Sequence, residues 1–218
     1  MGGGSIVLFL ITMAVLILAI GIHEFAHAYI ADLSGDPTPR MMGRVTLNPI
    51  AHLDPMGTLF MAITTWSGYG LGWGKPVMVR HDKMNNPRWD SLLVAIAGPI
   101  SNLLQAAVYA VLLRGMLLSG LVAPLFMTFL LIGVIVNVSL AVFNMIPLGP
   151  LDGHWIVGAF LPEPIRTQWF QFNRGIGSFV FLALVLIPVQ GGSILGLVMS
   201  PIADFFTTLL LGNLPIPS

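Results

Sequence analysis

Four long stretches without a charged residue constrain the fold of this chain more than any other feature. A helix needs about 20 residues to cross the roughly 30 Å hydrocarbon core of a bilayer, because each residue rises only about 1.5 Å. Each stretch reaches that length; they are Gly2–Ile22, Ser91–Leu113, Gly115–Leu151 and Gly175–Ala203. The sequence therefore predicts an all-α polytopic membrane protein. We expect one membrane-embedded domain, 1–218, with a core at 6–158 and C-terminal helices at 173–212.

The last stretch contains turn-forming residues that divide it. Pro188, Gly191 and Gly192 favour a break between two helices, near Phe179–Ile187 and Ile194–Leu211. With this division the chain has about five transmembrane helices. The first stretch differs from a secretory signal, because no Lys or Arg precedes it and no small-residue cleavage pattern follows it. We therefore expect it to be a retained helix.

The composition excludes several classes of function. Hydrophobic residues make up 56% of the chain and charged residues only 8%, which disfavours a water-soluble fold. The 9 Lys and Arg balance the 9 Asp and Glu, so no basic surface is available for nucleic acid. The absence of cysteine excludes disulfides, iron–sulfur clusters and thiol nucleophiles. Any metal site must therefore be built from His, Asp or Glu.

The segment Asp32–Asp90 is the most polar part of the chain. It carries six of the nine basic residues, so the positive-inside rule places it in the cytoplasm. Within it, the 11 apolar residues Met56–Trp66 are too few to cross a bilayer, which predicts a re-entrant or interfacial element. The loose alternation over Arg40–Ile50 predicts a short β-hairpin. Its edge at Arg44–Asn48 could bind an unwound substrate by strand addition.

A metal-binding pattern directly follows the first apolar stretch. His23, Glu24 and His27 form H-E-x-x-H, which on a helix places two imidazoles one turn apart with a carboxylate beside them. The alternative is a group of polar residues at the membrane end of a helix, but such residues are costly there. Zinc in a hydrolytic site needs three protein ligands and an open position for water. No third His follows at the local spacing, so a distant residue must supply the third ligand.

Asp152 is the leading candidate for that ligand. It directly follows the charge-free stretch Gly115–Leu151, and the predicted topology returns it to the membrane face of His23 and His27. Two prolines and two glycines in Asn144–Gly153 break the helix and free its backbone where a cavity could be lined. On these residues alone, a solvated aspartate in a helix-terminal loop is equally compatible.

Together these motifs resemble the site-2 protease family of intramembrane zinc metalloproteases. The resemblance covers about Ile6–Gly158 and is greatest to the short prokaryotic branch that lacks a PDZ domain. Besides H-E-x-x-H it rests on four matches, which are Gly98-Pro99-x-x-Asn102, Asn144-x-x-Pro147-x-x-Pro150-Leu151-Asp152-Gly153, Gly43–Pro55 and Gly72–Val77.

The resemblance implies a role for each site residue. His23, His27 and Asp152 would bind one Zn²⁺ per chain. Glu24 would be the general base, and Asn144 would contact the substrate or the oxyanion. The implied activity is zinc-dependent hydrolysis of a peptide bond within or next to a transmembrane helix of a membrane-protein substrate. The enzyme would be a multi-pass protein of the cell membrane with its active site towards the cytoplasm. Whether it forms a homo-oligomer is left open.

A transporter or ion-pathway protein is the main alternative, since intramembrane His, Glu and Asn also line ion paths. It predicts paired polar residues in inverted repeats, and we find none. An inactive scaffold is disfavoured, because its structure alone would not require Glu24. The sequence leaves open the roles of Asn102, His52 and His154, and it does not identify the substrate or a regulatory partner.

Overall fold

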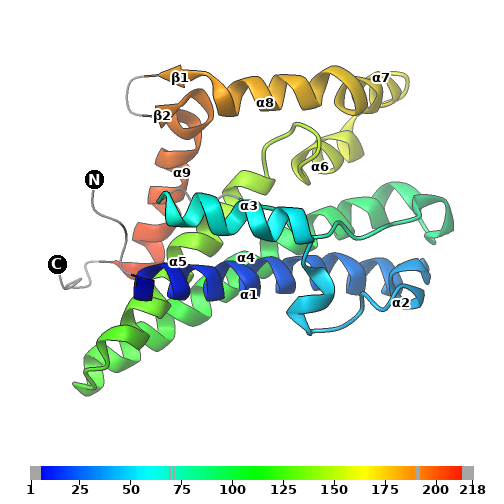
Figure 1. Ribbon diagram of the computed structural model, residues 1–218. Coiled ribbons are helices and arrows are strands. Elements are labelled where there is room, and N and C mark those ends of the chain that lie inside the picture. Colours follow the sequence, from blue (N-terminus) through cyan, green and yellow to red (C-terminus); the bar gives the residue numbers. More distant parts are fainter. Residues whose placement is uncertain (1–5, 69, 71, 190–191, 213–218) are drawn as a thin grey trace.

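Five long apolar helices dominate the structure, a computed structural model that describes residues 6–68, 70, 72–189 and 192–212 (Figure 1). The predicted all-α membrane architecture is confirmed, with five helices long and apolar enough to cross a bilayer. They are α1 (Ile6–Leu33), α4 (Pro87–Ser119), α5 (Pro124–Asn144), the run Ile165–Leu186, and α9 (Ile194–Leu211). The first four residues of the predicted stretch Gly2–Ile22 lie outside the described residues.

Helices α1, α4 and α5 form the central bundle, in which each packs against the other two (Figure 1). Helix α4 buries a small or polar side chain at every fourth position, at Gly98, Asn102, Ala106 and Ala110. Such a row lets the backbones of membrane helices approach closely. Near the C-terminal end of α4, buried Leu, Val and Met side chains join α4 to α5 and α9. The bundle therefore fixes α1 relative to α4, and the site is built on this pair.

Prolines and a glycine set the boundaries of the bundle helices. Pro87 and Pro124 begin α4 and α5, where the missing N–H leaves no donor unpaired in the first turn. Helix α4 ends at Ser119 and is capped by Gly120, which has φ 70°, a left-handed conformation that glycine adopts at no steric cost.

The connection between the first two spans is helical, and the predicted β-hairpin at Arg40–Ile50 was wrong. This connection contains α2 (Thr38–Met41), η1 (Pro49–His52), α3 (Pro55–Trp66) and η2 (His81–Lys83). Pro49 lacks the N–H group that a hairpin ladder needs, and the Arg44 side chain is buried instead of lining a strand. The predicted edge at Arg44–Asn48 is therefore not a strand.

Helix α3 takes the place of the predicted re-entrant element. It contains Met56–Trp66 and lies against α1 (Figure 1). Residues 72–80 lead into η2 without helix, and within them Gly74 forms an isolated β-bridge with Leu53. Gly57 and Gly72 permit this packing, because a Cβ on either would lie within 2.5 Å of Trp73 or Met61 atoms. The extended segment 72–79 is thereby held against α3, and its Gly74 lies beside Ile20 and Glu24 of α1.

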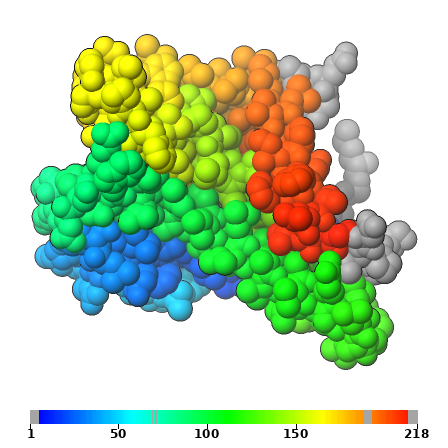
Figure 2. Space-filling view, turned by 180° about the vertical axis from the view of Figure 1, so that it is seen from behind, coloured from blue at the N-terminus to red at the C-terminus, as the bar shows by residue number. Residues whose placement is uncertain are grey.

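The C-terminal part divides as predicted. One helical run ends at Leu186 and α9 begins at Ile194, with the short strands β1 (Pro188–Val189) and β2 (Gly192–Ser193) between them. Gly191 lies outside the described residues. The run starts at Ile165, earlier than the predicted Phe179, and consists of α7 (Ile165–Phe172), the π-helix η3 (Asn173–Gly177) and α8 (Ser178–Leu186). Figure 2 shows this yellow-to-orange layer beside the green α4–α5 pair, with α9 in red.

Candidate metal centre

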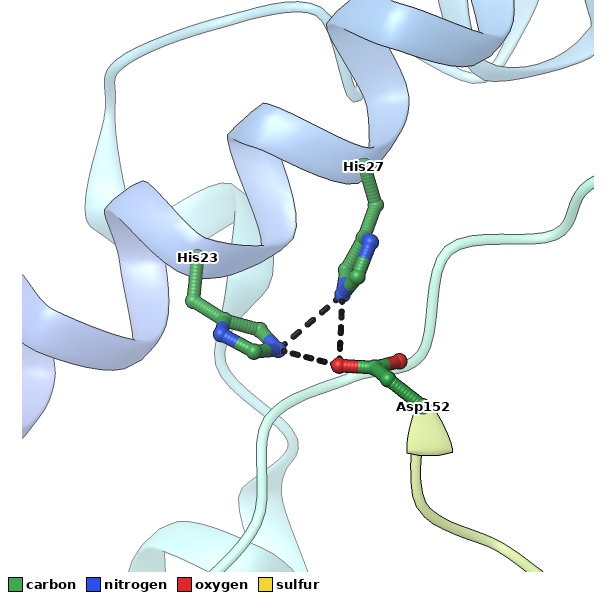
Figure 3. Close-up of side chains that lie close together, drawn as sticks. All are labelled: His23, His27 and Asp152. Atoms are coloured by element: carbon green, nitrogen blue, oxygen red, sulfur yellow. Dashed lines mark hydrogen bonds and ion pairs between the residues drawn. The ribbon is translucent and has the colours of Figure 1, made fainter. Parts of the chain in front are cut away.

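Three side chains from two distant parts of the chain meet at one point. His23 and His27 lie one turn apart on α1, and Asp152 immediately precedes α6 (Gly153–Phe160). Their Nε2 atoms lie 3.0 Å apart, and each is 3.3 Å from Asp152 Oδ2 (Figure 3). The structure therefore brings Asp152 to the two histidines, as the topology predicted.

Hydrogen bonds fix the orientation of both imidazoles. His23 Nδ1 donates to Asn102 Oδ1 at 2.6 Å, and His27 Nδ1 donates to the Val94 carbonyl at 2.7 Å. Asn102 in turn donates through Nδ2 to Asn137 Oδ1 at 2.8 Å, which assigns its oxygen as the acceptor for His23. With a hydrogen on each Nδ1, both Nε2 atoms are free to act as ligands. Asn102 thus orients His23 and also joins α4 to α5.

The triangle has the chemistry and the dimensions of a zinc site. Zinc lies about 2.0–2.1 Å from His nitrogen and carboxylate oxygen, so two ligands of a tetrahedral site are about 3.3 Å apart. The three distances of 3.0–3.3 Å agree with that spacing. Asp152 Oδ2 is buried and has no hydrogen-bond partner. A carboxylate oxygen and two ring nitrogens that converge in this way are stabilised by a cation, and they fit Zn²⁺.

Gly98 makes room for both rings. A Cβ at this position would lie 2.4 Å from His27 Nε2 and 2.5 Å from His23 Cε1. We expect Gly98→Ala to displace the imidazoles and weaken zinc binding about 10- to 100-fold, the effect of losing a residue that supports a metal ligand. Zinc competition with a fluorescent chelator measures this. Gly115→Ala is the matched control, because a Cβ at Gly115 on the same helix would contact nothing within 4 Å. Equal zinc affinity in both variants would contradict the assigned packing.

Glu24 lies beside the triangle and is held by the extended segment. Its Oε2 accepts a hydrogen bond from the Val77 N–H at 3.2 Å. Arg44 Nη2 is 3.9 Å from the same oxygen. Gly74 lies close by, since a Cβ there would be 3.4 Å from Glu24 Cγ. The carboxylate is therefore partly buried, anchored through one oxygen, and within the same cavity as the histidines.

A buried arginine anchors this segment. Arg44 is only 2% exposed, and its guanidinium donates to the carbonyls of Pro76 at 3.0 Å and of Lys75. It also donates to Nδ1 of His52, whose Nε2 donates to the Thr46 carbonyl at 2.8 Å. Burial lowers the pKa of His52, and the Arg44 charge acts in the same direction. His52 is therefore a neutral structural residue that supports the 75–77 backbone beneath Glu24.

A cavity of about 530 Å³ opens onto the three converging side chains. Asn144 lies on its wall, where its Nδ2 donates to the Leu140 carbonyl one turn earlier at 2.9 Å. His81 lines the cavity as well, and its ring stacks on Trp155 with centroids 4.0 Å apart. His154 is not among the residues that line the cavity, and its Nδ1 donates to the Leu151 carbonyl. The rest of the wall is mainly apolar, formed by Ile20, Val77, Val79, Val94, Ala95, Leu140, Phe143 and Leu151.

Comparison with known proteins decides the family. The sequence profile of Peptidase family M50 matches residues 11–124 and 116–188, which contain the two histidines and Asp152. The chain belongs to peptidase family M50. A Bacillus subtilis protein named "Putative zinc metalloprotease YwhC" is 39% identical over 179 residues, which cover 80% of this chain and 79% of that protein. "Putative zinc metalloprotease Rip2" of Mycolicibacterium smegmatis is 27% identical over 83% of this chain and 68% of its own length. No solved structure matches significantly.

Membership of family M50 confirms the resemblance to the site-2 proteases. This M50 peptidase is a zinc metalloprotease and a multi-pass membrane protein. The cluster of His23, His27 and Asp152 is the group of metal-ligating residues that the described part of the chain offers. The transporter alternative is not favoured, because both the family profile and the named relatives are peptidases.

Sequence reasoning missed three buried polar side chains around the site. Arg44 was seen only as a basic loop residue, whereas it anchors the segment beside Glu24. Asn137, fully buried in α5, bonds Asn102, and Asn173, buried in η3, bonds the Gly149 N–H. For Asn137, a polar amide within the otherwise apolar α5 was the available signal, whereas Asn173 lies among other polar residues and gave none.

Proposed function

We propose that this M50 peptidase is an intramembrane endopeptidase that hydrolyses a peptide bond within or next to a transmembrane helix of a membrane-protein substrate. The observation that carries the proposal is the position of the site. The two histidines and Glu24 belong to α1, an apolar helix long enough to span a bilayer, and the cavity beside them has a mainly apolar wall. A substrate that reaches this cavity from the lipid must itself be apolar.

In the proposed site His23, His27 and Asp152 would hold one zinc ion per chain. Zinc, when bound, supplies a Lewis acid and lowers the pKa of a coordinated water from 15.7 to about 7. Glu24 accepts the proton of the attacking water and returns it to the leaving amine, as a general base and then a general acid. Its anchored Oε2 leaves the second carboxylate oxygen for this transfer.

Asn144 is proposed to contact the substrate at the same cavity. Its Nδ2 has two hydrogens, and the Leu140 carbonyl accepts one of them. The second is available to the carbonyl oxygen of the scissile bond, on which negative charge develops as water attacks. Asn144→Ala should therefore affect turnover more than zinc binding.

The substrate has to unwind before its bond is cut. The cavity beside the metal-ligating side chains has a volume of about 530 Å³, and it is bounded by the backbone of residues 72–77 and by α5. The carbonyls of an intact helix are also bonded within the helix. We therefore propose that the enzyme binds a short, locally extended stretch of the substrate.

We also propose that the site faces the cytoplasm in a cell membrane. The basic segment Asp32–Asp90 follows α1 directly, and the positive-inside rule supports a cytoplasmic location for that segment. His23 and Glu24 lie in the second half of the 28-residue α1, close to the end from which this segment continues.

Helix-breaking residues in the substrate test the proposal. We expect a membrane-helix substrate with Gly-Gly beside the cleaved bond to be cut about 15- to 30-fold faster than one with Leu-Leu. Each glycine lowers the cost of unwinding by about 0.8–1 kcal/mol. Initial rates with enzyme and substrate in the same detergent micelles measure this. The same replacement two turns from the bond is the control and should leave the rate unchanged, and equal rates at both positions would contradict unwinding at the site.

A further inference from the structure

The loop that carries Asp152 is held by a helix that lies outside the central bundle. This loop joins α5 to α6, and α6 lies between α4 and α7 (Figure 1). The far end of α6 is attached to α4, because Arg88 donates to the carbonyls of Ala159 at 2.7 Å and Leu161 at 3.1 Å. The end of α6 next to Asp152 is attached to α7 and η3.

Two hydrogen bonds from α7 and η3 bracket Asp152. Asn173 Oδ1 accepts the Gly149 N–H at 2.7 Å, three residues before Asp152. Trp169 Nε1 donates to the His154 carbonyl at 2.8 Å, two residues after it. Trp169 and Asn173 lie one turn apart, and Asn173 Nδ2 donates to the Trp169 carbonyl at 3.1 Å. The two bonds therefore originate from one rigid face of a single helical run.

This face is the buried side of the run Ile165–Leu186. Within the run, only Asn173 and Gly177 are buried among the described residues, and Asn173 is 3% exposed. The loop approaches closely here, since a Cβ on Gly149 would lie 2.8 Å from the Asn173 carbonyl oxygen. The approach occurs where the helix opens into a π turn, a feature that is frequent at functional sites. The buried Asn173 amide thus bonds the loop through Oδ1 and its own helical run through Nδ2.

From this bracket we propose that Trp169 and Asn173 are positioning residues for the metal centre, which act by fixing the loop that presents the Asp152 carboxylate to the two histidines. The inference rests on the proposed ligand role of Asp152. It gives α7 and η3 a function in the catalytic unit, although they carry no residue that reaches the metal centre. Apart from the two histidine nitrogens 3.3 Å away, Asp152 Oδ2 has no polar partner among the described residues, so the loop backbone sets the position of this carboxylate.

Zinc affinity of the full-length purified protein tests the inference. We expect Asn173→Leu and Trp169→Phe each to weaken zinc binding about 10- to 100-fold in chelator competition. Asn173→Asp keeps the acceptor for the Gly149 N–H and should restore most of the affinity. Gln171→Leu, an exposed amide on the same helix, is the matched control and should bind zinc normally. If Asn173→Leu fails to fold, Trp169→Phe alone decides the outcome.

A double-mutant comparison separates positioning from a purely structural role. In an Asp152→Ala background, Asn173→Leu should have little further effect on zinc affinity, because the residue through which it acts is absent. A merely structural residue would lower the melting temperature of the zinc-free protein and leave zinc affinity unchanged, which would overturn the inference. If Asp152→Ala itself binds zinc normally, the proposed ligand set has failed. If only Asp152→Ala weakens binding, the ligand set stands and the positioning role is wrong.

Discussion

Glu24→Gln is expected to keep zinc and to lose proteolysis. The amide has nearly the same shape as the carboxylate and can still accept the Val77 N–H, but it cannot take a proton from water. Loss of a general base lowers the rate by about 10²–10⁴-fold, so the residual activity should be faint. The measurement is the initial rate of cleavage of a membrane-helix substrate, with zinc content determined on the same preparation.

Glu163→Gln is a closely matched control for this change. Glu163 is the only other glutamate of the chain, and it is exposed beyond the site, where it pairs with Thr167 and Arg166. Its amide variant should retain full activity and zinc. Near-normal cleavage by Glu24→Gln would assign the proton transfer to another group and would remove Glu24 from the proposed mechanism.

Asp152→Ala is expected to have the largest effect on zinc binding. It removes one of the three proposed ligand atoms and leaves two imidazole nitrogens 3.0 Å apart, a site that is incomplete for tetrahedral zinc. The loss of affinity should exceed the roughly 10- to 100-fold that follows from removing a residue that only supports a ligand. Zinc bound per chain, measured by elemental analysis across a series of buffered free-zinc concentrations, gives the comparison.

An exposed aspartate provides the reference for Asp152. Asp82 pairs with Arg80 at the surface, and Asp82→Ala should leave zinc binding unchanged. Unaltered zinc stoichiometry and affinity in Asp152→Ala would mean that the third ligand is a different residue. The 3.3 Å approach of its carboxylate to both histidines would then have another explanation.

The sequence was sufficient for the spans and for the candidate metal site because both have strong local signals. A charge-free stretch of 20 residues has few stable alternatives in a bilayer, and H-E-x-x-H fixes the spacing of its histidines on a helix. Asp152 was harder to predict as a candidate ligand, since its approach to His23 depends on long-range topology. It could be reached by counting spans, because an outward and a return helix bring the end of α5 to the side of α1 that carries the histidines.

The connection between α1 and α4 could not be predicted, because tertiary contacts determine its structure. The alternation at Arg40–Ile50 is compatible with a strand, but the guanidinium of the buried Arg44 donates hydrogen bonds to the carbonyls of Lys75 and Pro76. That pairing joins residues more than thirty positions apart and leaves no periodic trace in the sequence. The supporting role of Asn173 was hidden for the same reason, since it depends on a contact with Gly149.

The position of the cleaved bond tests the central claim most directly. Enzyme and a single-span substrate are reconstituted together in liposomes, and mass spectrometry of the products identifies the bond that is cut. The proposed function predicts a zinc-dependent cut inside or immediately beside the hydrophobic helix, on the side of the basic segment Asp32–Asp90, and no cut with Glu24→Gln. Cleavage only in water-exposed loops far from the helix, or an identical cut by Glu24→Gln, would contradict it.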